Sequence, residues 1–334
     1  MRVAIYGAGS LGTILGAYIT RAGYEIELIN RNEAHIKALQ ESGAQIVGGV
    51  EFLQRVVAYT PSEMSGVYDI IFLMTKQQHN AEVVQMLRGY LAEDGALVTF
   101  QNGLPEVGIA DIIGEERVLG CAVAWGATLL RPGVCELTSS PDSITFSLGS
   151  LGSSHSHHLA KVKELLECMG RVDVEENFIG TRWSKLLINA AFSGMSALLG
   201  GTFGEVSKPH KSRRVVQALI KECIDVCATA GIRIEPVQGK DIVKLLNYTN
   251  PIKRLFSFMI IPIAIRKHAN LKASMLQDLE RGKLTEVDAI NGAVSQFGRR
   301  VGCPTPMNDR VVDIIHKIER GELTPSFDNL KFFE

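Results

Sequence analysis

The N-terminal stretch of the chain constrains the fold most strongly. An apolar run over residues 2–6 leads directly into Gly-x-Gly-x-x-Gly at residues 7–12, and helical periodicity follows over residues 11–22. Gly23 marks the end of that helix, and a second apolar run covers residues 25–30. This order of strand, glycine turn, helix and strand is typical of a dinucleotide-binding βαβ unit, which predicts a parallel sheet.

The residues of the glycine loop have distinct expected roles. Gly7 permits the tight turn, Gly9 lets the backbone approach a pyrophosphate, and Gly12 allows the helix to pack against the strand. Backbone N–H groups at the helix start, around Ser10 and Leu11, have no partner within the helix and can bind phosphate oxygens. We therefore predict that these five residues bind the cofactor.

The end of the second strand indicates which dinucleotide is bound. An NAD site usually has an acidic residue there for the ribose 2′-hydroxyl, and an NADP site has an arginine nearby. This chain has Asn30 and Arg31 instead of a carboxylate. The Arg31 guanidinium suits a 2′-phosphate, so we predict NADP(H) as the cofactor. A solvated loop arginine is the alternative interpretation.

Length and composition point to two domains of an ordinary globular protein. We expect a cofactor-binding domain at residues 1–152 and a second domain at residues 153–334, because 334 residues exceed one typical core. The net charge of −1 gives no basic excess for nucleic acid or an anionic membrane. The longest apolar run, residues 255–265, is too short to span a bilayer and contains Pro262.

The cysteines and the N-terminus favour a cytoplasmic location. The six cysteines form no Cys-x-x-Cys pattern, which fits a reducing compartment, and the chain begins with a strand rather than a signal peptide.

A Gly/Ser/His-rich linker covers residues 150–158, but its histidines have no acidic or thiol partner at ligand spacing, so we predict no metal site. The oligomeric state stays open, a homodimer included.

Polar residues follow two further apolar runs of the first domain. Lys76 comes shortly after residues 69–74, and Asn102 comes after residues 96–100. Ligands of doubly wound sheets bind at the carboxyl ends of the strands, so we predict that Lys76 meets a phosphate or an anionic substrate and that Asn102 lies near the nicotinamide. The alternatives are a solvated lysine and an ordinary Asn-Gly turn.

The second domain is predicted to be all-helical. Segments with helical character cover residues 159–169, 179–199, 213–230, 236–246, 273–280, 286–301 and 309–320. Within the second of these, Lys185, Asn189 and Ser193 recur every four residues and form one polar stripe on an otherwise apolar helix. A desolvated lysine has a lowered pKa and suits general acid catalysis. The alternative is a lysine that extends its ammonium to solvent.

At this point the sequence resembles the 2-dehydropantoate 2-reductase (ketopantoate reductase) family. The resemblance rests on Gly7–Gly12, Thr75-Lys76, Gln101-Asn102-Gly103, Trp183-x-Lys185-x-x-x-Asn189, Ser274-Met-x-x-Asp278, and Thr285-Glu286-x-Asp288-x-x-Asn291-Gly292. It implies an α/β protein with an N-terminal Rossmann-type doubly wound sheet and a C-terminal helical domain like that of 6-phosphogluconate dehydrogenase. It also implies NADPH-dependent reduction of a small 2-oxo acid, in the pathway to pantothenate and coenzyme A.

The resemblance also implies residue roles. Lys185 would be the general acid, and Glu286 would be the second essential catalytic residue, in contact with both cofactor and substrate. Asn189 and Ser274 would bind substrate. Without the resemblance, Glu286 and Asp288 would simply be acids that favour the positive end of a helix.

Three more roles follow in the same way: Asn102 would touch cofactor and substrate, and Lys76 and Arg31 would touch the cofactor. The chain departs from the family's pattern at Ser193, where the family often has asparagine, and in an apolar insertion at residues 250–269. We expect Ser193 to line the substrate pocket. These departures keep open a different 2-oxo acid as substrate, while an NADP-binding sensor without turnover and a 3-hydroxy acid dehydrogenase are further alternatives.

Overall fold

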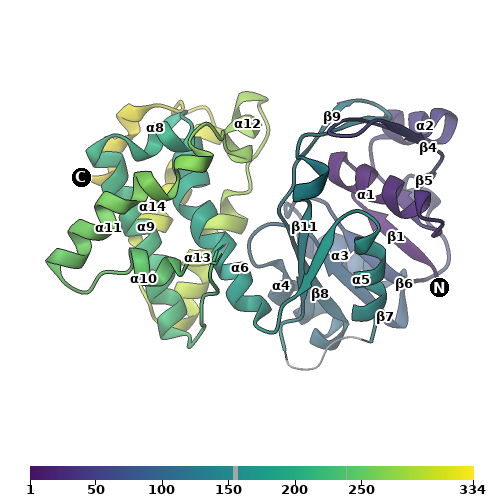
Figure 1. Ribbon diagram of the computed structural model, residues 1–334, viewed down its shortest axis with the longest axis horizontal. Coiled ribbons are helices and arrows are strands. Elements are labelled where there is room, and N and C mark those ends of the chain that lie inside the picture. The colour runs from purple at the N-terminus through teal and green to yellow at the C-terminus, as the bar shows by residue number, and fades with distance from the viewer. Residues whose placement is uncertain (153–156, 238) are drawn as a thin grey trace. The chain divides into compact units, whose positions relative to one another are not determined.

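The computed structural model describes residues 1–152, 157–237 and 239–334, so residues 153–156 of the predicted linker at residues 150–158 lie outside the described residues. Contacts divide the chain into two compact units (Figure 1). The first comprises residues 1–101 and 105–178, and the second comprises residues 102–104 and 179–334. The division falls after Phe178, rather than after residue 152 as predicted, because the segment between them completes the sheet of the first unit.

The first unit contains a doubly wound sheet, as predicted. Its eight strands lie in the order β12-β11-β8-β7-β6-β1-β2-β5. Their bounds are β1 Val3–Tyr6, β2 Glu27–Ile29, β5 Val57–Tyr59, β6 Tyr68–Leu73, β7 Leu91–Thr99, β8 Val118–Val123, β11 Thr145–Gly149 and β12 Arg171–Val174. All neighbours are parallel except β11 and β8.

Helices cover both faces of this sheet. They are α1 Ser10–Arg21, α2 Glu33–Ser42, α3 Asn80–Arg88, α4 Pro105–Ile113 and α5 Leu159–Glu167. Alternate residues of β1 face different cores: Val3 and Ile5 belong to the cluster that includes side chains of α1 and α5, whereas Ala4 and Tyr6 belong to the cluster with α3 and α4. A strand buried on both faces is continuously apolar, which explains the sequence of β1.

A smaller second sheet was not predicted as such. It has the order β4-β3-β10-β9, with β3 Ala44–Gly48, β4 Phe52–Gln54, β9 Ala127–Arg131 and β10 Val134–Leu137. The residue pattern predicts strands at residues 45–50 and 54–59 on either side of a Gly-Gly turn. The structure confirms the first as β3. The second is wrong as predicted, because only Gln54 lies in β4, which pairs with β3, while residues 57–59 join the main sheet as β5.

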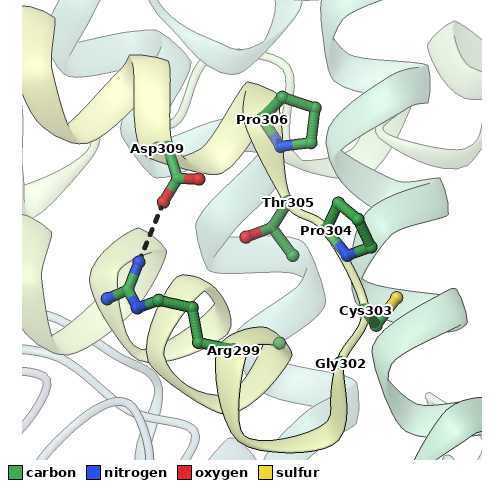
Figure 2. Close-up of a pocket in the computed structure, with 8 residues that line it drawn as sticks. Arg299, Gly302, Cys303, Pro304, Thr305, Pro306 and Asp309 are labelled. Atoms are coloured by element: carbon green, nitrogen blue, oxygen red, sulfur yellow. Dashed lines mark hydrogen bonds and ion pairs between the residues drawn. The ribbon is translucent and has the colours of Figure 1, made fainter.

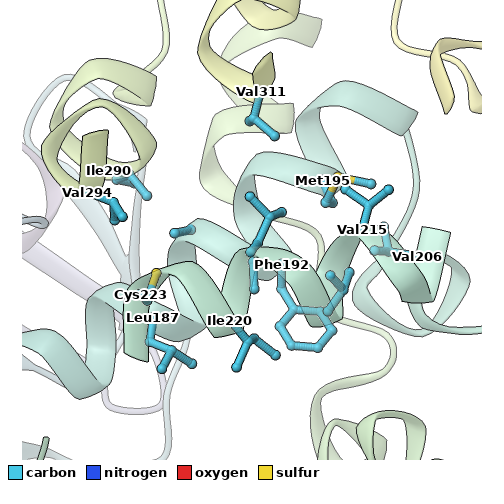
Figure 3. Close-up of a cluster of buried hydrophobic side chains, with 14 of the residues drawn as sticks. Leu187, Phe192, Met195, Val206, Val215, Ile220, Cys223, Ile290, Val294 and Val311 are labelled. Atoms are coloured by element: carbon cyan, nitrogen blue, oxygen red, sulfur yellow. The ribbon is translucent and has the colours of Figure 1, made fainter. Parts of the chain in front are cut away.

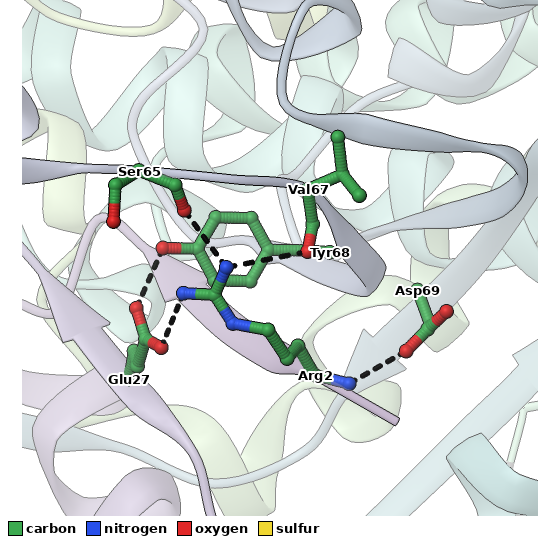
Figure 4. A network of polar contacts seen from close by, with 6 residues as sticks. All are labelled: Arg2, Glu27, Ser65, Val67, Tyr68 and Asp69. Atoms are coloured by element: carbon green, nitrogen blue, oxygen red, sulfur yellow. Dashed lines mark hydrogen bonds and ion pairs between the residues drawn. The ribbon is translucent and has the colours of Figure 1, made fainter.

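A polar network joins the amino ends of β1, β2 and β6 (Figure 4). The Arg2 guanidinium forms an ion pair with Glu27 at 2.7 Å and lies 4.5 Å from the centre of the Tyr68 ring. Tyr68 donates its hydroxyl hydrogen to the same carboxylate at 2.6 Å, and the Arg2 backbone N–H donates to Asp69 at 2.6 Å. Burial raises the pKa of Tyr68, with Glu27 adding to the rise. The network fixes these strands at the ends opposite the glycine loop.

The second unit is helical, as predicted. Its elements are α6 Phe178–Ile188, a π-helical segment Asn189–Ser193, α7 Gly194–Leu199, α8 Phe203–Ser207, α9 His210–Thr229, α10 Ile242–Leu246, α11 Pro251–Ala264, α12 Ser274–Glu280, α13 Val287–Val301 and α14 Pro306–Glu319. Short 3₁₀ turns in the chain cover Pro61–Glu63, Glu115–Arg117, Pro141–Ser143, Arg266–His268 and Phe327–Phe333.

Helix α9 is central to the core of this unit. It packs against α8, α10, α11, α13 and α14, and Figure 3 shows Val215 and Ile220 of α9 in the same apolar cluster as Phe192 of the π segment. The predicted insertion at residues 250–269 consists mainly of α11. None of the helices in the described residues is long and apolar enough to cross a membrane.

The turn between α13 and α14 is tight and lines a surface pocket (Figure 2). A Cβ on Gly298 would lie 2.6 Å from the carbonyl oxygen of Cys303, so only glycine allows the chain to return this closely. Arg299 and Asp309 bridge the two helices with an ion pair at 3.3 Å. The turn sets the position of α14 against α13. This matters for the candidate site because Glu319 of α14 accepts hydrogen bonds from Thr285, directly before Glu286.

Candidate active site

Two glycines of the loop after β1 are required by the fold itself. Gly7 has a φ of +98°, and a Cβ there would lie 2.6 Å from the backbone nitrogen of Thr75. A Cβ on Gly12 would lie 2.9 Å from the Ile5 side chain. These contacts match the predicted roles of a turn and of close packing between helix and strand.

Packing does not require glycine at position 9. A Cβ there would meet nothing nearer than the Gly7 carbonyl oxygen at 3.9 Å. Gly9 stands directly before α1, which begins with no side-chain cap and no acidic residue in its first turn. The positive end of the helix, with the N–H groups around Ser10 and Leu11, is therefore suited to binding a phosphate.

Arg31 follows β2, the neighbour of β1, and is exposed. No hydrogen bond or ion pair holds its side chain within the described part of the structure. Burial raises the pKa of Tyr6 at the end of β1, and the nearby Arg31 charge opposes that rise, which places the guanidinium close to the strand that enters the glycine loop. The Asn32 side chain accepts a hydrogen bond from His35 N–H at 3.2 Å and caps α2, so Arg31 sits on a fixed turn.

The carboxyl ends of β6 and β7 are tied together next to the glycine loop. Gln101 donates hydrogen bonds to Asn80 at 2.9 Å and, at a longer 3.4 Å, to Thr75, the residue that packs against Gly7. Lys76 follows Thr75 and is exposed. The structure thus places Lys76 after the end of β6, directly next in sequence to the residue that lies against Gly7.

A π-helical segment sets the geometry of the polar stripe in the second unit. Lys185 lies in α6, and Asn189 and Ser193 are the first and last residues of the π segment. Four residues of an α-helix overshoot one turn by about 40°, so a stripe with two such steps would drift by about 80°. Four residues of the wider π turn fall short of one turn, which cancels most of that drift.

The exposure of these three side chains differs. Lys185 and Asn189 are partly exposed, whereas Ser193 is buried. The sequence predicted a buried lysine, and the structure corrects this to a half-buried one. The stripe therefore reaches solvent at its Lys185 end.

Two further predicted residues begin neighbouring helices. Ser274 is the exposed first residue of α12, and Glu286 directly precedes α13. Both helices pack against the π segment. The Asn102 side-chain amide, which belongs to the second unit by its contacts, donates to Glu286 at 3.5 Å, the long end of hydrogen-bonding distance.

The two acids at the start of α13 have different surroundings. Thr285 is buried, and its N–H and hydroxyl donate to the Glu319 carboxylate of α14 at 2.7 and 2.8 Å, which fixes where Glu286 stands. Asp288 is exposed and contacts His316 of α14 at 3.0 Å. Asp288 is thus part of a surface contact, while Glu286 faces Asn102.

A buried polar network connects α9 and α14 with the π segment. The Glu222 carboxylate accepts hydrogen bonds from Met307 N–H at 2.8 Å, from Asn308 N–H at 3.0 Å and from the Asn308 side-chain amide at 2.7 Å. Asn308 accepts from Asn291 at 2.9 Å, and Asn291 donates to the carbonyl oxygen of Ala190 at 3.0 Å. Burial raises the pKa of Glu222 against the opposing effect of the three donors.

The network holds the π segment from its buried side. A Cβ on Gly194 would lie 2.6 Å from the Asn291 side-chain oxygen, so the helix approaches that amide as closely as glycine permits. Sequence reasoning missed Glu222 and Asn308. The available signal was the placement of Glu222 within a largely apolar stretch of α9.

A doubly wound sheet with a glycine loop after its first strand, followed by a helical unit, is the architecture of a pyridine-nucleotide oxidoreductase. The family model described as "Ketopantoate reductase PanE/ApbA" matches residues 3–151, and "Ketopantoate reductase PanE/ApbA C terminal" matches residues 177–319. The chain belongs to the ketopantoate reductase family, as its sequence motifs predicted.

Relatives and solved structures cover nearly the whole chain. A 2-dehydropantoate 2-reductase of Streptococcus pyogenes serotype M3 is 27% identical over 96% of this chain and 98% of the relative. The structure of a PanE/ApbA family ketopantoate reductase from Ralstonia eutropha has a TM-score of 0.81 at 22% identity and covers 96% and 99% of the two chains. D-mandelate dehydrogenase with NADH and anilino(oxo)acetate has a TM-score of 0.79 at 24% identity, with the same coverage.

Proposed function

We propose that the protein reduces 2-dehydropantoate to pantoate with NADPH, and that Lys185 is the general acid. The observation that carries the proposal is the aligned stripe of Lys185, Asn189 and Ser193, which places an ammonium and two neutral polar groups along one side of a helix. Family membership supports the reaction class.

Lys185 would act on the oxygen of the 2-oxo group. When bound, the reduced nicotinamide supplies a hydride to the oxo carbon, and negative charge develops on the oxygen. The Lys185 ammonium would hydrogen-bond to that oxygen, stabilise the developing alkoxide and transfer a proton to it from Nζ. The product is the 2-hydroxy acid, and the lysine regains its proton from solvent, to which the half-buried side chain has access.

The remaining polar groups of the second unit would bind and orient the substrate. The Asn189 amide and the Ser193 and Ser274 hydroxyls offer neutral donors and acceptors for the substrate carboxylate and hydroxyl groups. Glu286 would contact both substrate and cofactor, with Asn102 as its neighbour. The fixed start of α13 supports this role, because orientation contributes to rate only when the group is held in place.

The first unit would bind the cofactor. The pyrophosphate would lie at the open start of α1, against Gly7, Gly9, Ser10, Leu11 and Gly12. Lys76 would meet a phosphate at the end of β6. Arg31 would bind the 2′-phosphate and favour NADPH over NADH, which its exposure after β2 allows.

A different 2-oxo acid is the second candidate substrate. The Ser193 side chain is shorter than the asparagine often found in the family, so the pocket has one amide fewer. Membership in this family speaks against the alternative of a 3-hydroxy acid dehydrogenase. A sensor without turnover is disfavoured by the presence of both Lys185 and Glu286.

The test is NADPH oxidation followed at the nicotinamide absorbance, with 2-dehydropantoate and a panel of other 2-oxo acids. We expect the highest kcat/KM with 2-dehydropantoate, and a better panel member would reassign the substrate. The Lys185→Ala variant should lose kcat by orders of magnitude while the NADPH dissociation constant stays near the wild-type value. No turnover by the wild-type protein, with NADPH still bound, would favour the sensor.

A further inference from the structure

The second unit contains a largely enclosed apolar cavity of about 430 Å³. It lies among α9, α10, α11 and the junction of α6 with the π segment, where Ile188, Ile220, Leu246 and Ile260 line it. Folded cores leave few voids larger than a water molecule, whereas sites for organic ligands are apolar and span roughly 300–1,000 Å³. The cavity therefore has the size and lining of a ligand site rather than of a packing defect.

The cavity is separate from the polar stripe. Its lining includes Ile188 and Phe192, which lie one position before Asn189 and Ser193 on the same helix. Side chains four residues apart share a helix face, so Ile188 and Phe192 form a face of their own, turned away from that of Asn189 and Ser193. A ligand in the cavity would contact a different side of the helix from the proposed substrate.

The rim of the cavity is positively charged. Lys240, Arg266, Lys267 and His268 belong to its lining and are exposed. The described residues that line it include no acid, and Lys240, Arg266 and Lys267 form no ion pair within the described ranges. An apolar interior with unpaired cations at its edge is complementary to an amphipathic anion.

We propose that this cavity binds an aliphatic monocarboxylate of medium chain length. The hydrocarbon chain fills the space between α9 and α11, and the carboxylate meets the 3₁₀ turn Arg266–His268. Ile263 lines the cavity and is 70% exposed, which marks the entrance beside this turn. This site goes beyond the proposed reductase activity and does not depend on it.

Calorimetric titration of the full chain with decanoate tests the proposal. We expect saturable binding of one decanoate, and we expect the Ala264→Trp variant to abolish it, because Ala264 lines the cavity and is itself exposed at the end of α11. Met259→Trp is the matched control on the same helix, since Met259 is 61% exposed and lies outside the lining. An absence of decanoate binding, or equal binding by the Ala264→Trp variant, would overturn the proposal.

A second comparison isolates the charge. The Arg266→Ala/Lys267→Ala double variant should bind decanoate about tenfold more weakly, the effect of roughly one lost ion pair, and should bind decanol as the wild type does. The Lys244→Ala/Lys253→Ala double variant, with two exposed lysines outside the lining, should match the wild type. Unchanged decanoate affinity in the first double variant would refute the role of the carboxylate.

Phospholipid vesicles distinguish a free carboxylate from a membrane lipid. Helix α11 also carries exposed apolar side chains, so sedimentation with phosphatidylglycerol vesicles is the appropriate comparison. We expect decanoate binding without vesicle binding. The opposite result would be vesicle binding that is lost in the Met259→Asp variant and kept in the Ala264→Trp variant. That result would assign the exposed apolar face of α11 to membrane binding and overturn the cavity proposal. Wild-type thermal stability and NADPH binding in each variant confirm that it is folded.

Discussion

The buried network of Glu222, Asn308 and Asn291 makes a quantitative prediction for Glu222→Gln. The carboxylate accepts three N–H hydrogen bonds, two from Asn308 and one from Met307. An amide of the same shape has one acceptor oxygen. If that oxygen keeps the two donors of Asn308, the amide NH₂ group faces the Met307 N–H, and two donors then point at each other.

The cost follows from these contacts. Leaving one buried donor unsatisfied costs about 1–3 kcal/mol. Loss of the charge adds no further cost, because burial already disfavours the ionised form of Glu222. We therefore expect Glu222→Gln to lower the free energy of unfolding by about 1–3 kcal/mol. For a domain of this size the melting temperature should fall by roughly 2–12 °C.

Urea unfolding and thermal melting at pH 8 measure this loss. The matched control is Asp225→Asn on the same helix, which removes a partly exposed pair with Lys221 and should cost less than about 1 kcal/mol. The network ends on the carbonyl of Ala190, in the π segment that carries Asn189 and Ser193. Glu222→Gln should therefore also raise KM for the oxo acid, and it should leave the NADPH dissociation constant unchanged. Equal stability of the two variants would refute the reasoning.

Three further predictions concern the first unit. Arg31→Ala should raise KM for NADPH much more than KM for NADH, and equal effects would rule out a contact with the 2′-phosphate. Gly9→Ala should keep wild-type stability and weaken NADPH binding, whereas Gly7→Ala should unfold at a lower temperature, because its Cβ would lie 2.6 Å from a backbone nitrogen. Burial lowers the pKa of His35, so the unfolded chain takes up the proton first, and stability should fall as pH drops below about 6.5. The pH dependence of urea unfolding, compared with that of His35→Gln, checks this last prediction, and an equal slope in both proteins would contradict it.

The sequence predicted the elements that have a strong local signal. Helix α13 lies within one residue of its predicted range of residues 286–301, and the strands β1 and β6 lie within one residue of theirs, because each is a continuous pattern with clear ends. Strands β9, β10 and β12 were missed. They are only four or five residues long. Strands β9 and β10 pair with each other around Pro132-Gly133, a turn signal that sequence reasoning overlooked, whereas β12 pairs with β11 across helix α5 and has no local signal.

The same distinction holds for the candidate site. Gly7, Lys185 and Glu286 stand in recognisable motifs, and the sequence could nominate them. Glu222 and Asn308 are 86 positions apart, and neither is part of a motif, so only the folded chain reveals their contact. The π segment was predicted as part of one continuous helix, because a single wide turn leaves no mark on apolar periodicity.

That segment amounts to one extra residue accommodated within a helix. Removal of either Ala190 or Ala191 would leave an uninterrupted α-helix of ordinary composition. Because four α-helical residues turn about as far as five π-helical ones, Gly194 and later residues would keep their places, and the residue four positions after Asn189 would become Gly194. Alignment of this helix with relatives therefore has to allow a one-residue gap inside it, since a gapless comparison can pair Ser193 with a residue that occupies a different place.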